Sequence, residues 1–132
     1  MTQRATGSFE VALTPQSEPD AAPGSTLGRL SIDKQFHGDL VAVSKGEMLT
    51  AMTDVDGSAG YVAIERVTGI LNGRQGSFAL QHTGSANRGV QQLAITVVPD
   101  SGTGQLIGIM GEVSINIVDG RHFYTLEYSL PD

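Results

Sequence analysis

Glycine recurs along the whole chain and separates short stretches in which apolar and polar residues alternate. There are 17 glycines among 132 residues, and many fall in segments typical of turns, such as NGRQGS, SANRG and PDSGTG. Successive residues of a strand point to opposite faces, so this alternation is the pattern of strands with one buried face. No long segment shows the apolar period of a helix. The pattern predicts an all-β protein.

The alternating stretches predict eight or nine strands joined mostly by short connections. They lie at residues 7–14, 28–37, 39–45, 47–54, 60–71, 76–84, 91–98, 105–118 and 121–130. The stretch 105–118 is expected to be broken or kinked at Gly108 or Gly111, because glycine inside a strand often marks a bulge or bend. Such a series favours a single domain, residues 1–132, folded as a closed antiparallel up-and-down β-barrel of about eight strands. Closure removes the exposed edges that an open sheet of this length would have to protect. A barrel of this size is either filled by side chains or able to hold one small ligand.

The one long connection, residues 15–26, has the sequence PQSEPDAAPGST and holds three of the five prolines. Proline fixes φ and lacks a backbone N–H, so this segment is predicted to be an extended surface loop or a crossover between two strands. A lid over the barrel mouth is the alternative.

Charge and residue types exclude several classes of function. The net charge is −6 and the basic residues are scattered singly, so neither nucleic acid nor an anionic membrane is an expected partner. The absence of cysteine excludes a thiol nucleophile, a thiolate metal site and a disulfide framework. His37, His82 and His122 lie on different predicted strands without close ligand spacing, so no metal site is predicted. No cofactor motif is found, and SGTGQLIG lacks the lysine and the following helix of a P-loop. The start of the chain has no apolar run like that of a signal peptide, so a cytoplasmic location is the default expectation.

The alternation also predicts which side chains face the barrel interior. Phe78 and Leu80 define the inner face of residues 76–84, and they bring His82 inside with them. If the turn after Leu71 has an even number of residues, Glu65 faces the interior too. A four-residue loop would place Glu65 directly opposite His82, whereas a two-residue Asn-Gly turn would place the two on a diagonal of the same face.

The predicted interior therefore contains an unusual number of polar side chains, and these are the candidate site residues: Lys34, Tyr61, Glu65, His82, His122, Tyr124 and Tyr128. An unpaired buried carboxylate is strongly unfavourable, so Glu65 needs a partner, for which His82 and Lys34 are the candidates.

Three interpretations of this interior stay open. The first is a pocket that binds a small apolar or amphipathic ligand. The second is an isomerase or cyclase in which Glu65 or His82 transfers a proton and a tyrosine donates a hydrogen bond to the developing oxyanion. The third is a packed barrel with a structural or oligomeric role.

The outer face of residues 60–71 carries three apolar side chains, Val62, Ile64 and Ile70. Single exposed hydrophobic residues are common, but three on one strand favour a homodimer contact or a covering by the proline-rich loop.

Two long stretches and one short one carry a resemblance to a known family. GYVAIERVTGILNGRQGSFALQHTG, VVPDSGTGQLIGIMGEVSI and HFYTLEYSL resemble a bacterial family of small domains of unknown function whose barrel is similar to that of plant allene oxide cyclase. The resemblance spans most of the chain and implies a calycin-like closed barrel that often self-associates. It implies no activity, because chemistry does not transfer with a fold alone. The matching residues are Gly60, Glu65, Gly69, Gly73, Gly76, Ser77, Phe78, His82, Gly84, Ser101, Gly102, Thr103, Gly104, Leu106, Gly108, Gly111, His122, Tyr124, Glu127 and Tyr128.

Overall fold

Antiparallel strands follow one another along nearly the whole chain in a computed structural model, which describes residues 2–131. The strands are β1 (Gln3–Pro15), β2 (Asp20–Ala22), β3 (Ser25–Gly38), β4 (Leu40–Met52), β5 (Ala59–Leu71), β6 (Arg74–Asn87), β7 (Val90–Val97), β8 (Met110–Val118) and β9 (Arg121–Ser129). One 3-10 turn, η1 (Gly104–Leu106), lies between β7 and β8. Within the described residues, no helix is long and apolar enough to cross a membrane.

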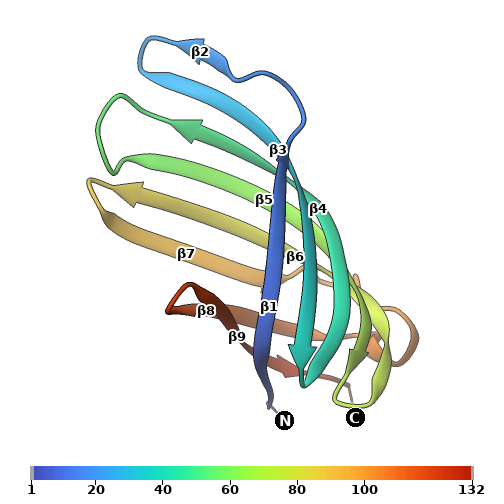
Figure 1. Ribbon diagram of the computed structural model, residues 1–132. Helices are drawn as coiled ribbons and strands as arrows, with labels where there is room; N and C mark the ends of the chain where they lie inside the picture. Colours follow the sequence, from blue (N-terminus) through green and yellow to red (C-terminus); the bar gives the residue numbers. More distant parts are fainter. Residues whose placement is uncertain (1, 132) are drawn as a thin grey trace.

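The sheet closes on itself because β1 pairs with both β3 and β9 (Figure 1). From β3 to β9 each strand pairs with the next one along the chain, and the short β2 adds to the far end of β3. The result is a closed antiparallel barrel of eight strands with one extra strand. This confirms the predicted fold class.

The structure differs from the predicted elements in three places. Residues 39–45 and 47–54 form the single strand β4, and the segment SKGE, predicted as a turn, lies inside it. Glycine is needed at position 46 because β4 and β5 lie very close together there. A side chain would collide with the backbone of Ile64 and Glu65. Residues 15–26 are not a crossover, because β1 and β3 are neighbours and β2 forms a small exposed hairpin with β3. The stretch predicted at 105–118, with a break at Gly108 or Gly111, is a strand only from Met110 onward, and Gly108 with its positive φ of 82° lies just before it.

The segment before β8 closes one end of the barrel. Where β7 has ended, the backbone of β6 bonds to this segment instead: Ser77 accepts a hydrogen bond from the N–H of Thr103 at 2.8 Å, and the N–H of Ala79 donates to the hydroxyl of Ser101 at 3.0 Å. Leu106 and Ile109 of the same segment are buried in the core. SGTGQLIG is therefore the cap of the barrel, in which side chains and turns replace a strand.

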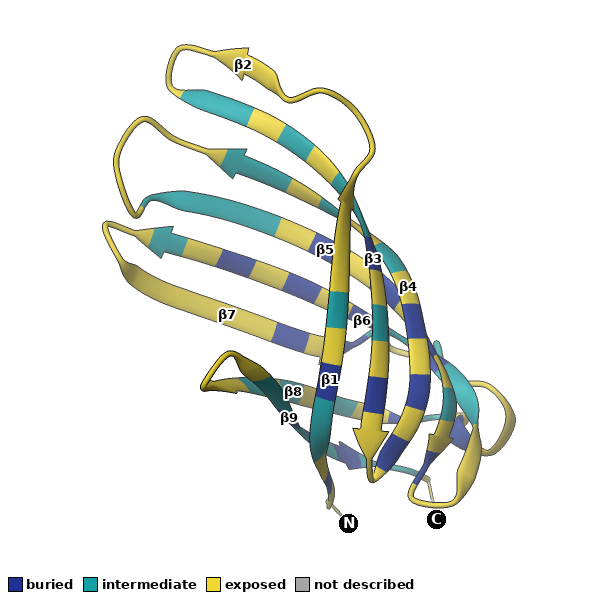
Figure 2. Ribbon diagram, viewed as in Figure 1, coloured by how far each residue is buried: buried dark blue, intermediate teal, exposed yellow. Residues whose placement is uncertain are grey.

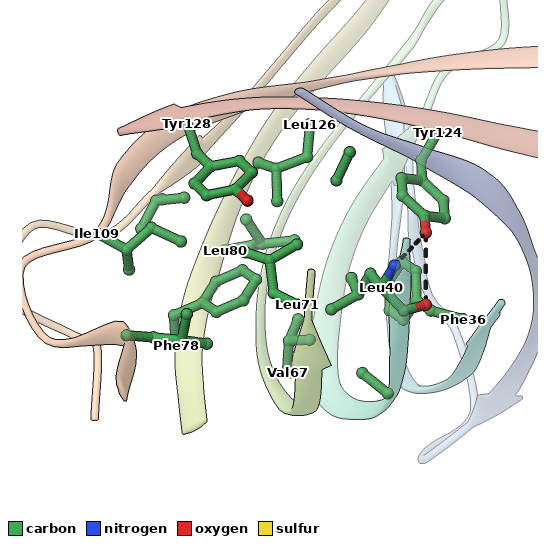
Figure 3. Packing of buried hydrophobic residues seen from close by; sticks show 14 of the residues in the cluster. Phe36, Leu40, Val67, Leu71, Phe78, Leu80, Ile109, Tyr124, Leu126 and Tyr128 are labelled. Atoms are coloured by element: carbon green, nitrogen blue, oxygen red, sulfur yellow. Dashed lines mark hydrogen bonds between the residues drawn. The ribbon is translucent and has the colours of Figure 1, made fainter. Parts of the chain in front are cut away.

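The two ends of the barrel differ in how completely they are packed. The closed half lies at the chain termini, the cap and the β3–β4 and β5–β6 turns, and it holds the hydrophobic core, including Leu71, Phe78, Leu126 and Tyr128 (Figures 2 and 3). The open half lies at the β4–β5, β6–β7 and β8–β9 turns, where the strands spread apart (Figure 1). Buried residues are sparse there and the inner face is mostly half-exposed or exposed (Figure 2).

Loss of strand pairing accounts for the spreading. The backbone pairing of β7 with β8 covers only Ile95–Val113 and Thr96–Glu112. The β1–β9 pairing ends at Phe9–His122, so the last part of β1 pairs with β3 alone. Both sides of the β8–β9 hairpin therefore separate from their neighbours in the open half.

Candidate functional site

Four neighbouring strands place the polar residues of the interior side by side. Lys34 on β3 pairs with Ser44 on β4, and Gly46 on β4 pairs with Glu65 on β5. One buried residue on each strand marks its inner face: Phe36, Leu40, Val67 and Phe78. Because side chains alternate along a strand, Lys34, Ser44, Gly46, Glu65 and His82 lie on the same inner face.

The β5–β6 turn decides how Glu65 and His82 meet. Asn72 and Gly73 form a two-residue turn with positive φ values of 46° and 84°, which suits a tight hairpin. Glu65 therefore pairs with Leu80, and His82 pairs with Ala63. The two side chains lie on a diagonal of one face, as the two-residue alternative predicts, and the four-residue loop is wrong.

Glu65 is the centre of a buried hydrogen-bond network. Its Oε1 accepts from the Ser44 hydroxyl at 2.8 Å, and its Oε2 accepts from Lys34 Nζ at 2.8 Å and from His82 Nε2 at 2.5 Å. The side chain of Glu65 is fully buried, and those of Lys34 and His82 are only 8% and 5% exposed. Three donors thus satisfy a carboxylate that would otherwise be very costly to bury.

The network fixes the charge of Glu65. Burial by itself would raise the pKa of this carboxyl, but the hydrogen bond from His82 and the charge and hydrogen bond of Lys34 outweigh it and lower the pKa to about 2. Glu65 is therefore ionised at neutral pH, and the charge of Lys34 balances it. Lys34 Nζ also lies 5.0 Å from the ring centroid of Phe9 and 5.8 Å from that of Phe36, which favours the cation at this buried position.

A recess of about 400 Å³ lies in the open half, on the inner side of β4 to β7. One row of paired residues crosses it, with Thr50, Tyr61, Gly84 and Leu93 on successive strands. The next row toward the closed half contains His82, so the buried network lies directly beneath the recess. Met48, Met52, Ala59 and Ala86 supply most of the remaining apolar wall.

Tyr61 connects the recess to the network. Its ring lies across Gly84 of β6, where any side chain would collide with it. Its ring centroid is 6.4 Å from that of His82. Burial raises the pKa of the Tyr61 hydroxyl, and the negative charge of Glu65 raises it further. The group is therefore a neutral O–H at physiological pH.

The remaining candidate residues lie elsewhere in the barrel. The Tyr124 hydroxyl donates to the carbonyl of His37 at 2.8 Å. It also accepts from the N–H of Leu40 at 2.9 Å (Figure 3). The Tyr128 hydroxyl accepts from Asn72 Nδ2 at 2.7 Å. Both tyrosines tie the closed half together. His122 packs against Phe9, with ring centroids 5.2 Å apart, and has no hydrogen bond to the network among the described residues.

Several residues of the site escape prediction from the alternation. Ser44 is missed because the sequence was divided into two strands at Gly46, which hid the continuous inner face of β4. Met48 and Thr50 are missed for the same reason. The signal that finds them is the pairing partner: once Lys34 and Glu65 face inward, the residues opposite them on β4 must do so as well. Among residues 2–131, no three His, Cys, Asp or Glu side chains come together in a way that could hold a metal ion.

The outer face carries the predicted apolar side chains. Val62, Ile64 and Ile70 are about half exposed, and Val41, Val43 and Leu49 of β4 lie on the same outer face. The proline-rich segment leaves these side chains exposed. The homodimer stays a prediction.

Comparison with known proteins assigns the chain to a family. The model of the family described as "Protein of unknown function (DUF3224)" matches residues 5–128, nearly the whole chain. The chain belongs to the DUF3224 family. This confirms the resemblance to a bacterial family of domains of unknown function. A crystal structure of a DUF3224 protein of unknown function from Shewanella oneidensis MR-1 is similar to the chain, with 48% identity over 100% of both chains and a TM-score of 0.94. No match was found among curated proteins. The likeness to calycins and to allene oxide cyclase stays a prediction.

Proposed function

We propose that this DUF3224 protein binds a small, mostly apolar molecule in the open half of the barrel, with the polar end of the molecule toward Tyr61 and His82. The observation that carries the proposal is the apolar recess of about 400 Å³ with Tyr61 in its wall. Small-molecule sites commonly have volumes of roughly 300–1,000 Å³, apolar walls and a few polar groups that fix orientation.

The contrast between the halves supports a binding role over a purely structural one. The closed half already supplies a continuous core, with Val67, Leu71 and Phe78 at most 1% exposed. On the same inner face, Met52 and Leu93 of the open half are 56% and 47% exposed. A barrel with only a structural role gains nothing from apolar side chains that are exposed in a recess.

The buried network gives the recess a rigid floor. Its donors and acceptor are mutually satisfied, and no buried side-chain nitrogen or oxygen within the described part of the chain lacks a partner. A satisfied polar network holds its members in one arrangement. A ligand above it would meet a preorganised surface, which lowers the cost of binding.

Titration with the neutral fluorescent probe N-phenyl-1-naphthylamine tests the proposal. We expect saturable binding that is lost in Leu93→Glu, which places a charge in the recess. The matched control is Leu49→Glu, because Leu49 is 54% exposed on the outer face and its replacement leaves the recess unchanged. Loss of binding in Leu49→Glu with binding retained in Leu93→Glu would move the site to the outer wall and reject the proposal.

A second candidate function is an isomerase or cyclase. The observation that favours it is the imidazole of His82, held by a carboxylate at 2.5 Å and adjacent to a tyrosine, which is an arrangement suited to proton transfer. Native mass spectrometry of protein from its own host would identify a bound compound for assay. Retained binding with lost conversion in Glu65→Gln and His82→Ala supports the enzyme, and loss of binding alone supports the carrier.

A further inference from the structure

The outer face of β4 and β5 exposes a group of apolar side chains. Exposed and buried positions alternate along both strands, so the exposed ones lie on the outside of the barrel (Figure 2). Six apolar side chains there are between 45% and 59% exposed: Val41, Val43, Leu49, Val62, Ile64 and Ile70. Single exposed apolar residues are ordinary, whereas large exposed apolar patches mark interaction sites. This face is therefore suited to contact with another molecule.

Charged side chains cross the middle of the same face. Along β4, the outward residues are Val43, Lys45, Glu47 and Leu49 in that order. Their order is apolar, basic, acidic and apolar. On β5, Arg66 pairs with Lys45, so a second cation lies in the same row. A strand with this order is complementary to a second copy of itself laid antiparallel, because lysine then meets glutamate and valine meets leucine.

The charges of this face are only loosely engaged within the chain. Lys45 Nζ lies 3.6 Å from the carboxylate of Asp33, and Glu47 pairs with Arg29 at 2.9 Å. All four of these side chains are more than half exposed. Arg66 is exposed and takes part in no ion pair among residues 2–131. Exposed ion pairs contribute little stability, so these groups can exchange partners at low cost.

A hollow of about 790 Å³ lies beside the charged rows. Most of the residues that line it belong to the outer face, and these are Arg29, Glu47, Leu49, Val62, Ile64 and Gln81. The hollow therefore combines apolar side chains with the carboxylate of Glu47. An arginine side chain entering from outside suits it, because the stem packs on apolar atoms while the guanidinium pairs with the carboxylate.

From these observations we infer that two copies of the chain pack face to face through β4 and β5. The two-fold axis runs across the strands, between the positions of Lys45 and Glu47. It places Lys45 of each copy against Glu47 of the other, and Val43 of each copy against Leu49 of the other. Packed sheets keep their strand directions within about 30°, so these residues stay opposite each other near the axis. Symmetry forms each contact twice. The inference is independent of the proposed function.

Charge disfavours the other simple two-fold arrangement of this face. An axis along the strands, between β4 and β5, would bring Lys45 of one copy against Arg66 of the other, and like charges in contact oppose association. The axis across the strands instead places Arg66 over Ile64 of the second copy, in the hollow that contains Glu47. Each of the two cations then has a carboxylate opposite or beside it.

Sedimentation-velocity ultracentrifugation tests the inference. We expect the wild-type protein to be a dimer at roughly 100 μM, well above the micromolar dissociation constants of the weakest interfaces of standard size. Leu49→Glu should be a monomer at this concentration, because it places a carboxylate against Val43. The matched control is Val118→Glu, since Val118 is 47% exposed on the outer face of β8, and this variant should remain a dimer. Far-UV circular dichroism checks that both variants are folded.

Three results would overturn the inference. They are a wild-type protein that stays monomeric at this concentration, an assembly of more than two chains, and a dimer that survives Leu49→Glu.

A pair of charge reversals tests the position of the axis. Lys45→Glu places a glutamate against Glu47 of the second copy, and Glu47→Lys places a lysine against Lys45. Each variant alone should therefore raise the dissociation constant of the dimer at least about 10-fold. In an equimolar mixture of the two variants, every contact between positions 45 and 47 joins opposite charges, and dimers should form about as readily as in the wild type. A mixture that associates no better than its components, or single variants that dimerise like the wild type, would contradict the two-fold arrangement.

Discussion

The same strands form the closed half and the open half of the barrel. The contrast explains how one small barrel can be stable and still leave part of its inner face accessible. On β5, Val67 and Leu71 are completely buried, whereas Ala59 and Tyr61 on the same inner face are partly exposed. The cap at residues 101–108 fills the closed end, and no comparable segment covers the recess among residues 2–131. The stability of the fold therefore depends on one half, which leaves the inner face of the other half free to contact a ligand.

The largest expected difference between the halves is in the cost of truncating an inner-face side chain. Phe78 is 1% exposed in the core, and Phe78→Ala should reduce the free energy of unfolding by about 3–5 kcal/mol. Met52 is 56% exposed in the open half, and Met52→Ala should change it by less than about 0.5 kcal/mol. Urea denaturation of both variants measures the contrast, and equal costs would show that the open half is packed.

The network at the boundary of the two halves should act as a unit. Glu65→Leu leaves Lys34 buried without its partner, so we expect a loss of about 3–5 kcal/mol in the free energy of unfolding. In Lys34→Met combined with Glu65→Leu, no charge remains and most of this loss should be recovered. Chemical denaturation of Lys34→Met, Glu65→Leu and the double variant gives the coupling free energy between the two side chains. If the single effects simply add, the two side chains do not depend on each other.

Acid should weaken the fold through the same carboxyl. The pKa of Glu65 is about 2 in the folded protein against an ordinary value of 4.5, so folding favours the ionised form. The stabilisation is complete above pH 4.5, is lost as the pH falls toward 2, and is on the order of 3 kcal/mol in total. Denaturation midpoints at neutral pH and at about pH 3 measure the loss, with Glu65→Gln as the control that lacks this titration. A wild-type protein that loses no more stability than the Gln variant would contradict the lowered pKa.

The smallest expected effect concerns the cap of the closed half. The Thr103 hydroxyl accepts from the N–H of Ser77 at 3.0 Å and lies 2.6 Å from the Ser77 hydroxyl. Thr103→Val keeps the shape and removes these bonds, which should cost about 1 kcal/mol. Differential scanning calorimetry detects it as a lower Tm, whereas probe binding in the open half should be unchanged. Weaker probe binding would mean that the two halves are coupled.

Strand alternation was sufficient to predict the barrel and part of the site. Phe78 and Leu80 orient His82, and the parity of the Asn72–Gly73 turn brings Glu65 to the same face; both inferences need only the two-residue period. Ser44 was not predictable, because Gly46 has the signature of a turn until the strand opposite it is known. The cap was not predictable either, since its hydrogen bonds join turns and side chains that follow no period. The hydrogen bonds of Tyr124 involve a partner distant in sequence, Leu40, that the alternation does not indicate.

Methyl NMR of selectively labelled methionines tests the central claim most directly. Met48 and Met52 line the recess, whereas Met110 lies on β8 outside it and is 61% exposed. On addition of N-phenyl-1-naphthylamine, the account predicts that the Met48 and Met52 methyl signals shift together in a saturable way and that the Met110 signal stays in place. A shift of Met110 alone, or saturable binding that moves neither Met48 nor Met52, would contradict a ligand site in the open half of the barrel.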